Sequence, residues 1–398
     1  MIGIVFRLLI LITLVVNGYR PKKLTTLFEW KDLEFDFPSK EDREAALEGG
    51  LYIMKNGFPV DVDVDNNGRT FVTIPRLSKG IPYSLATVSN RSAANGPLLE
   101  PYPNYEAHSS HGGDCDGITS VFRVTIDQCN RLWVVDAGTI NKTQHCPPKI
   151  LVYNLEKDTL LFSYIIPEDQ YVSGKSQLNK PVVDIMKGQC NKTKVYVADV
   201  KVPGLLVFDQ ATEKSWRIED KSMNPDLEFE TFTIADESIN LIDGIYGMSL
   251  TPNSFRGERS LYFHVLTSDE KRSVPLKAIN NASMWMNNEK HPDVFKLIGN
   301  RGVQCGDEAM DSFGINYCGF MDPLSIFAWN INTPYRRGYV MELVNDPERL
   351  QFASGMKVIR NKQGRQELRV SSNRLQRIYS KTIDYDEVNF RIMSMKIN

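Results

Sequence analysis

A strand–turn–strand pattern that recurs along the chain constrains its fold more than any other feature. The pattern is clearest in CDGITSVFRVTIDQCNRLWVVD, residues 115–136. Residues 121–126 are mostly β-branched or aromatic, residues 127–130 are turn formers, and residues 132–135 form a second apolar run. Related segments follow at intervals of roughly sixty residues, the repeat length of a propeller blade with long connections.

The match between two such segments is close enough to indicate true repeats. Residues 132–136 are LWVVD, and residues 195–199 are VYVAD. Six segments share the pattern in whole or in part: residues 58–73, 115–155, 181–209, 243–265, 312–330 and 352–392. No helical pattern alternates with them, so we predict an all-β, six-bladed β-propeller with four-stranded blades. A pair of β-sandwiches is the alternative.

The two ends of the mature chain are expected to share one blade. Residues 27–35, LFEWKDLEF, have strand character and precede the first repeat, so they are available to pair with the last repeat. This closure would bring Trp30 close to Ile392. The best helical candidate follows at residues 39–48, with Ser39 as the N-cap and acidic residues in the first turn.

Three aspartates alternate with valines in residues 61–65 and suggest a calcium loop. An EF-hand would need Gly in place of Asn66 and Glu in place of Val72. Strict alternation instead predicts a half-buried strand, with residues 65–68 as its hairpin turn.

The proline-containing stretch at residues 75–103 is predicted to be an irregular surface link. His108, His111 and Asp114 follow it and could form a metal site. Their Ser and Gly neighbours provide no rigid element to hold ligands, so we expect a solvated loop. We expect no metal and no cofactor.

The N-terminal segment indicates export. Arg7 precedes an apolar run, and small residues follow it, so residues 1–18 are predicted to be a cleaved signal peptide rather than a membrane anchor. Residues 19–398 then form a single propeller domain, secreted and soluble. The formal net charge of −2 argues against nucleic-acid or membrane-surface partners. The oligomeric state stays open.

Six cysteines fit an oxidising compartment, and the sequence alone allows fifteen pairings. Cys129 and Cys190 lie at equivalent turns of successive repeats. Three pairs are candidates by position: Cys115–Cys146, Cys129–Cys190 and Cys305–Cys318. Zinc is the alternative, but no Cys-x-x-Cys occurs. Four glycosylation sequons lie in polar segments: Asn90, Asn141, Asn191 and Asn281.

Several longer motifs carry a family resemblance. They are residues 120–124 (SVFRV), 127–138 (DQCNRLWVVDAG), 146–149 (CPPK), 328–330 (AWN), 350–357 (LQFASGMK) and 386–391 (DEVNFR). Together they resemble the Yellow/major royal jelly protein family of insects over essentially the whole mature chain. The resemblance implies a six-bladed propeller, secretion, glycosylation and the pairs Cys115–Cys146 and Cys129–Cys190.

The resemblance also suggests a ligand. Some salivary members of the family sequester biogenic amines in the central cavity, and the matching contact positions here are Leu324, Tyr339 and Met341. Tyr339 replaces an Asn that is common in that branch. An amine pocket needs a carboxylate for the ammonium and an aromatic face for the ring. Because strand starts in a propeller face its central opening, further candidates are Asp243, Tyr246 and Phe320.

Three functions compete at this stage. The first is non-catalytic binding of a small aromatic or amine-type ligand in the central cavity. The second is tautomerisation of dopachrome-like compounds, which needs a general acid or base such as His264 or a carboxylate. No spacing demands catalysis, and residues 247–251 are not a nucleophile elbow because Thr251 replaces the second Gly. The third is a structural or nutritive glycoprotein without a ligand.

Overall fold

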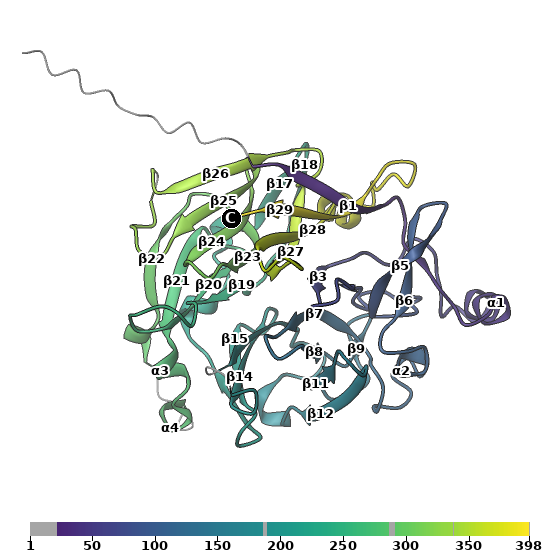
Figure 1. Cartoon of the computed structure of the whole chain (residues 1–398), viewed down its shortest axis with the longest axis horizontal. Coiled ribbons are helices and arrows are strands. Elements are labelled where there is room, and N and C mark those ends of the chain that lie inside the picture. The colour runs from purple at the N-terminus through teal and green to yellow at the C-terminus, as the bar shows by residue number, and fades with distance from the viewer. Residues whose placement is uncertain (1–21, 186–188, 286–290, 337, 398) are drawn as a thin grey trace, which may run out of the picture.

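Antiparallel strands form six four-stranded sheets that radiate from a common axis, as a computed structural model shows (Figure 1). The structure describes residues 22–185, 189–285, 291–336 and 338–397. The expected signal peptide, residues 1–18, lies outside this part of the chain. The predicted six-bladed propeller is confirmed.

In the first five blades the four strands run in sequence order from the axis outward. The first three blades are β3 (Asp61–Val64), β4 (Thr70–Thr73), β5 (Leu85–Ala93) and β6 (Gly96–Pro101); β7 (Val121–Ile126), β8 (Arg131–Asp136), β11 (Lys149–Asn154) and β12 (Thr159–Ile165); β13 (Leu178–Ile185), β14 (Thr193–Asp199), β15 (Gly204–Asp209) and β16 (Lys214–Ile218). The short strand β2 (Glu34–Phe35) adds to the first blade, parallel to β6.

The fourth and fifth blades follow the same order, and the sixth takes its outer strand from the other end of the chain. These blades are β19 (Ile245–Leu250), β20 (Ser260–Val265), β21 (Glu270–Pro275) and β22 (Lys296–Asn300); β23 (Cys305–Met310), β24 (Ile315–Met321), β25 (Leu324–Asn330) and β26 (Val340–Asn345); β27 (Phe352–Arg360), β28 (Gln366–Asn373), β29 (Phe390–Lys396) and β1 (Leu24–Trp30).

The ring is closed by the two ends of the chain. β1 pairs antiparallel with β29, which places Trp30 opposite Phe390 and Phe28 opposite Ile392. The predicted closure is therefore confirmed. The inner strands β3, β7, β13, β19, β23 and β27 each contact the next around the axis, and β27 contacts β3. The six inner strands therefore form a closed ring around the axis.

Strand alternation explains how the blades adhere to one another. Successive side chains of a strand point to opposite faces of the sheet. In β8, Leu132 and Val134 pack toward the first blade, while Trp133 and Val135 pack toward the third. All four are fully buried because both faces of the blade are covered. Each such side chain contributes on the order of 2 kcal/mol through burial.

Local signals in the sequence were reliable at α1 (Lys40–Glu48) and at the first hairpin. The Ser39 hydroxyl accepts a hydrogen bond from the Asp42 amide at 3.0 Å and caps α1, as predicted. Between β3 and β4, Asp65 Oδ1 accepts amide hydrogen bonds from Asn67 and Arg69. The alternating aspartates therefore belong to a strand and its turn. The strand is not half-buried as predicted, because Asp61 and Asp63 are buried as well as Val62.

Two expectations were wrong. The stretch predicted to be an irregular link contains β5 and β6, which pair with each other because its prolines lie at strand ends or outside the strands. The predicted solvated loop includes α2 (Glu106–Ser109), in which His108 is completely buried. Its Nε2 lies 2.9 Å from the Tyr102 carbonyl oxygen, and burial lowers the pKa of His108 to about 3.

The remaining elements connect the blades. They are the two-stranded ribbons β9 (Thr139–Ile140) with β10 (Thr143–Gln144) and β17 (Thr231–Ile234) with β18 (Glu237–Asn240), the helices α3 (Leu276–Ile279), α4 (Ala282–Trp285) and α5 (Leu375–Ser380), and four 3-10 turns at Glu168–Gln170, Lys221–Met223, Leu227–Phe229 and Pro292–Val294. Among the described residues, no helix has the length and apolar character needed to cross a membrane.

The six cysteines form three disulfides: Cys115–Cys146, Cys129–Cys190 and Cys305–Cys318. These are the three pairs proposed from the sequence. Cys129–Cys190 joins the second blade to the segment between β13 and β14 of the third. Cys305–Cys318 lies within the fifth blade, across β23 and β24.

Candidate functional site

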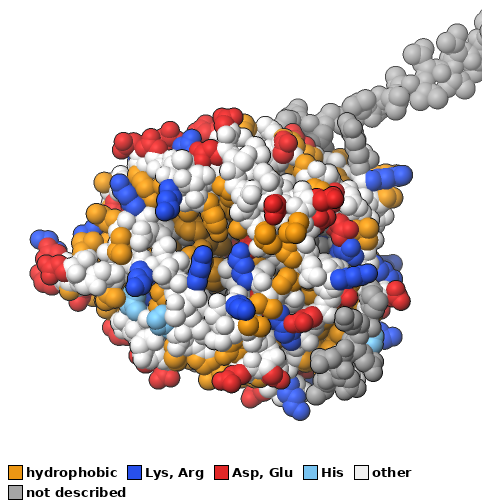
Figure 2. Space-filling model, turned by 180° about the vertical axis from the view of Figure 1, so that it is seen from behind, with side chains coloured by type: hydrophobic (Ala, Val, Ile, Leu, Met, Phe, Trp, Pro, Cys, Tyr) orange, Lys and Arg blue, Asp and Glu red, His pale blue; other side chains and the backbone are white. Residues whose placement is uncertain are grey.

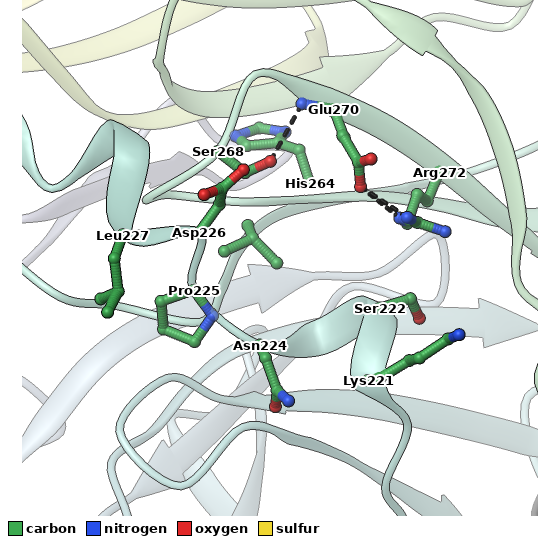
Figure 3. A pocket seen from close by; sticks show the side chains of 11 residues that line it. Lys221, Ser222, Asn224, Pro225, Asp226, Leu227, His264, Ser268, Glu270 and Arg272 are labelled. Carbon is green, nitrogen blue, oxygen red and sulfur yellow. Dashed lines mark hydrogen bonds and ion pairs between the residues drawn. The ribbon is translucent and has the colours of Figure 1, made fainter.

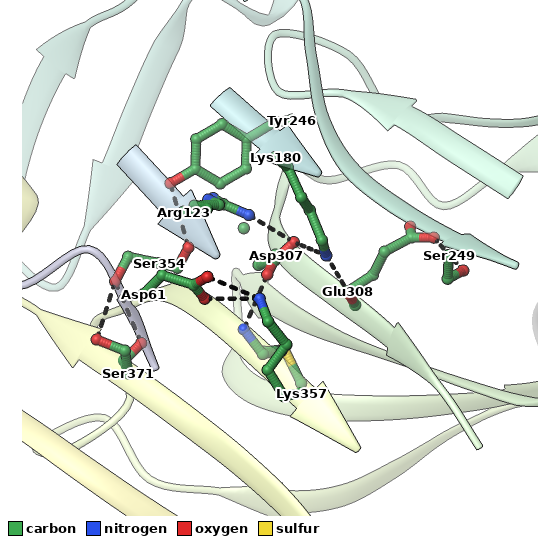
Figure 4. A network of polar contacts seen from close by, with 12 residues as sticks. Asp61, Arg123, Lys180, Tyr246, Ser249, Asp307, Glu308, Ser354, Lys357 and Ser371 are labelled. Atoms are coloured by element: carbon green, nitrogen blue, oxygen red, sulfur yellow. Dashed lines mark hydrogen bonds and ion pairs between the residues drawn. The ribbon is translucent and has the colours of Figure 1, made fainter. Parts of the chain in front are cut away.

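Buried charges from five inner strands meet around the middle of the axis (Figure 4). Asp61 of β3 accepts two hydrogen bonds from Lys357 Nζ of β27, at 2.9 and 2.7 Å. Asp307 of β23 pairs with Lys180 of β13 at 2.6 Å and with Arg123 of β7 at 2.8 Å. The inner strands are thus joined by ion pairs between side chains far apart in sequence.

Backbone amides complete the coordination of both carboxylates. The Val124 amide donates to Asp61 at 3.1 Å, and the Met356 amide donates to Asp307 at 2.8 Å. Burial alone would raise the pKa of Asp307, but Arg123 and Lys180 hold it below its usual value. A carboxylate with this many partners has little capacity left for a ligand. We therefore assign the middle of the axis a structural role.

A second buried cluster surrounds Glu308, the residue after Asp307. Its carboxylate contacts Lys271 Nζ, His264 Nδ1 at 2.6 Å and the Ser249 hydroxyl at 2.7 Å. His264 Nε2 also lies 2.7 Å from the Gly306 carbonyl oxygen. The imidazole considered as a general acid or base is therefore fixed on both nitrogens and completely buried.

His264 also lies close to the sulfur atoms of Cys305 and Cys318, an arrangement that resembles a metal site. The two sulfurs are bonded to each other, so neither offers a thiolate. The imidazole is left as a single ligand, which is too few for a zinc site.

A pocket lies at the end of the axis where the inner strands begin. Five of the six inner strands, or the residues just before them, contribute to its wall. Its aromatic side chains are Phe58, Phe122, Tyr246, Phe352 and Tyr379, and its polar ones include Gln177, Asn179, Asp243, Ser354 and Asn373. We call this the axial pocket. Figure 2 shows a hollow lined by hydrophobic side chains, with Lys and Arg side chains around it.

The axial pocket is narrow, with a volume of about 50 Å³. Ligand pockets more often offer ~300–1,000 Å³. A single aromatic ring therefore requires side chains at the mouth to turn outward. Tyr379 of α5 is 48% exposed and is the aromatic side chain of the wall with the most freedom to do so.

Asp243 and Tyr246 bring charge and an aromatic face to the axial pocket. Asp243 Oδ1 forms an ion pair with Lys201 Nζ, while Oδ2 has no hydrogen-bond partner among the described residues. Burial raises the pKa of Asp243, and Lys201 opposes the shift. The Tyr246 ring lies 4.2 Å from the Arg123 guanidinium carbon, a cation–π contact that fixes the ring.

Two asparagines of the same wall have unused acceptors. Asn179 and Asn373 are each 2% exposed, and neither Oδ1 has a hydrogen-bond partner among the described residues. The Asn373 side-chain amide donates to the Pro59 carbonyl oxygen at 3.0 Å, which orients its oxygen. Leaving a buried acceptor unpaired costs about 1–3 kcal/mol, and a ligand or a water that donates to it removes this cost.

The structure brings two of the six predicted ligand contacts, Asp243 and Tyr246, into the axial pocket. Leu324 packs in the hydrophobic cluster behind Tyr246. Phe320 stacks on Phe327 in the fifth blade, with ring centroids 4.2 Å apart. Met341 lies in the outermost strand of that blade and is 47% exposed.

Tyr339 adjoins the same outermost strand and is 42% exposed, with Arg336 over its ring. The outermost strand of a blade lies far from the axis, so the rule that strand starts face the opening does not extend to it. Asn179 and Asn373 were missed. Nothing in their local sequence signals that their carbonyl oxygens lack partners.

A larger, polar pocket of about 290 Å³ lies on the fourth blade, away from the predicted ligand contacts (Figure 3). One wall is residues 221–227, and the other carries Glu270 and Arg272, which pair with each other at 2.6 Å. Its wall includes the His264 imidazole but no Phe, Tyr or Trp side chain. It fits a flat ring less well than the axial pocket does.

The fold and the site together define a six-bladed propeller with an aromatic-walled pocket on its axis. The sequence model described as "Major royal jelly protein" matches residues 119–398. The chain belongs to the major royal jelly protein family, as its motifs indicated.

Three relatives cover nearly the whole chain. It is 34% identical to "Dopaminechrome tautomerase" of Drosophila melanogaster, across 96% of this chain and 84% of that protein. It is 33% identical to "Major royal jelly protein 9" of Apis mellifera, across 93% of this chain and 87% of that protein. It is 32% identical to "Protein yellow" of Drosophila yakuba, across 97% and 71%.

Proposed function

We propose that this protein binds a small aromatic, amine-type molecule in the axial pocket. The observation that carries the proposal is that Asp243 and Tyr246 line one pocket, which offers an acceptor for an ammonium beside a ring face. Asp243 has one oxygen free of protein partners. Phe122 and Phe352 supply apolar surface for the rest of a ring.

The proposal is tested by mixing the purified protein with dopamine and, separately, with serotonin while the heat of binding is recorded. Saturable heat that is lost in Asp243→Asn supports it, because the variant keeps the shape of the side chain and removes its charge. Absence of heat with both amines contradicts it. That result, together with no activity on dopachrome, would favour a structural or nutritive role.

Tautomerisation of a dopachrome-like compound in the same pocket is the second candidate. Such a reaction removes a proton from a ring carbon and adds one to a quinone oxygen, so it needs a general base close to the ring. Burial raises the pKa of Asp243 toward the range in which a carboxylate is an effective base. A relative at 34% identity is named a dopaminechrome tautomerase.

The decay of dopachrome absorbance separates the two candidates. Turnover by the wild-type protein, abolished in Asp243→Asn, would replace the binding-only proposal with the enzymatic one. A rate equal to that of buffer alone would reject tautomerisation.

We further infer that the protein is exported and glycosylated. Three disulfides and membership of this family fit an extracellular protein. The four sequon asparagines, Asn90, Asn141, Asn191 and Asn281, are all exposed, so each is accessible to modification. Mass spectrometry of the secreted protein before and after enzymatic deglycosylation tests this. An unchanged mass would contradict it.

A further inference from the structure

The ion-pair partner of Asp243, a residue in the wall of the axial pocket, is a lysine from outside that wall. Lys201, in the turn between β14 and β15, contacts Asp243 Oδ1 through Nζ and also reaches the Ile242 carbonyl oxygen at 3.3 Å. The Lys201 side chain is 39% exposed and the Asp243 side chain 8% exposed. Solvent therefore reaches this ion pair from the lysine side.

The ion pair changes which ligand suits the pocket. A simple ammonium must compete with Lys201 for the Asp243 carboxylate, and it brings nothing to satisfy the lysine. A ligand that carries an ammonium and a carboxylate on neighbouring atoms matches both members of the pair. Charge-assisted hydrogen bonds are about twice as strong as neutral ones, so this match matters for affinity.

The interior beneath the pocket also favours a ligand carboxylate. Three buried cations, Arg123, Lys180 and Lys357, surround only two paired carboxylates, Asp61 and Asp307. The Glu308 carboxylate is paired with Lys271, and burial raises the pKa of Asp63, which lies beside Asp61, to about 7, so Asp63 is only partly ionised at neutral pH. The axis therefore carries an excess of positive charge.

Arg123 has unused hydrogen-bonding capacity as well. It is completely buried, and its Nε and Nη2 have no hydrogen-bond partner among the described residues. Its guanidinium lies directly behind the Tyr246 ring of the pocket wall. Arg123 is paired with Asp307 on one side only, and its positive charge would also attract an anionic group in the pocket.

We propose that the ligand of the axial pocket is an aromatic α-amino acid, whose ammonium binds Asp243 Oδ2 and whose carboxylate binds Lys201 Nζ. This inference rests on the proposed function, because it concerns the same pocket and names its ligand class. The aromatic side chain of the amino acid occupies the space between Phe122, Tyr246 and Phe352.

The experiment compares L-dopa with dopamine, which share a ring and differ only in the carboxylate. Calorimetric titrations are run on the wild-type protein and on Lys201→Met, which keeps the length of the side chain and removes its charge. The matched control is Lys277→Met. Lys277 is an exposed lysine in the wall of a separate groove between the third and fourth blades.

The wild-type protein is expected to bind L-dopa roughly tenfold or more tightly than dopamine. Lys201→Met should reverse this order: L-dopa binding weakens by roughly tenfold, while dopamine binding becomes tighter because Asp243 is released from its partner. Lys277→Met should behave like the wild type. Thermal unfolding of each variant establishes that it is folded.

Two results overturn the inference while the proposed function stands. One is dopamine binding to the wild-type protein at least as tightly as L-dopa. The other is an unchanged ratio of the two affinities in Lys201→Met. If neither compound binds the wild-type protein, the proposed function itself fails, and the inference falls with it.

Discussion

Two aspartates on the same axis have opposite surroundings. Asp307, in the middle, is completely buried and is paired with Lys180, Arg123 and the Met356 amide. Asp243, at the end of the axis, has one partner, Lys201, and keeps one oxygen free. A carboxylate whose partners are all supplied by the protein holds the blades together, whereas one with a free oxygen can hold a ligand.

The comparison shows that burial alone does not identify a binding group. Both side chains are at least nine-tenths buried; Asp307 lies in the inner strand β23, and Asp243 lies two residues before the inner strand β19. The two carboxylates differ in how many protein groups they pair with and in whether solvent reaches the paired cation. Substitution of Asp307 should therefore act mainly on stability, and substitution of Asp243 mainly on binding.

The largest effect is expected for Asp307→Asn. The substitution leaves Lys180 and Arg123 as buried cations without a counter-charge, which costs about 3–5 kcal/mol in the free energy of unfolding. Urea unfolding followed by fluorescence measures it. Glu44→Gln is the control because Glu44 is exposed in its ion pair with Lys40. Equal stability of the two variants would contradict a structural role for the middle of the axis.

Asp243→Asn should affect binding instead of stability. We expect the affinity for dopamine to fall by roughly tenfold to a hundredfold, since a hydrogen bond to a charged group is worth about 1.5–3 kcal/mol. The free energy of unfolding should change by less than about 1 kcal/mol, because Lys201 is partly exposed and returns to solvent. If Asp243→Asn were strongly destabilised but still bound dopamine normally, Asp243 would have a structural role and not a binding role.

Asp63 extends the comparison to pH. Its carboxylate lies in β3 beside Asp61 and accepts amide hydrogen bonds from Ile126 and Val64, and burial raises its pKa to about 7. The unfolded value is ~3.9, so between pH 4 and 7 the folded state binds the extra proton. Its contribution to stability is therefore present at low pH and is lost as pH rises, by about 1.4 kcal/mol per pH unit.

Asp63→Asn should remove this contribution to the pH dependence of stability. Unfolding free energies of the wild type and the variant, measured at pH 5 and pH 7, test it. The wild type is expected to lose more stability than the variant between the two values. The same pH dependence in both proteins would show that Asp63 is ionised throughout the range.

The smallest effect is expected for the outer strand of the fifth blade. Tyr339→Ala and Met341→Ala should leave the affinity for dopamine unchanged, because both side chains lie at the outside of the blade. Calorimetric titration of both variants with dopamine, with Asp243→Asn titrated in parallel, measures these affinities. A tenfold loss in either variant would mean that the ligand binds at the outer strand and not on the axis.

Much of the fold was predictable because its signals are local. The alternation in β3, the turn at Asp65 and the cap at Ser39 depend on neighbouring residues, and each is found where expected. The fifth repeat was placed too late, since its inner strand β23 begins at Cys305. Gly306 and the two acidic residues of β23 hide its strand character in the sequence. The strand forms because it contacts both neighbouring inner strands.

The site was less predictable because its partners are distant in sequence. Asp243 was a candidate from its place before a strand, but Lys201 is forty-two positions away, and the pair exists only in the assembled ring. In the sequence, Asp61, Arg123 and Asp307 look like ordinary strand residues. Their ion pairs form only where their strands meet at the axis. His108 was placed in a solvated loop because its Ser and Gly neighbours offered no rigid element, yet tertiary packing buries it.

A crystal structure of the protein soaked with dopamine tests most directly whether the end of the axis is the binding site. We expect ligand density in the axial pocket, with the ammonium within hydrogen-bond distance of Asp243 and the ring against Tyr246. Density in the polar pocket between Lys221 and Arg272, with the axial pocket empty, would contradict this account.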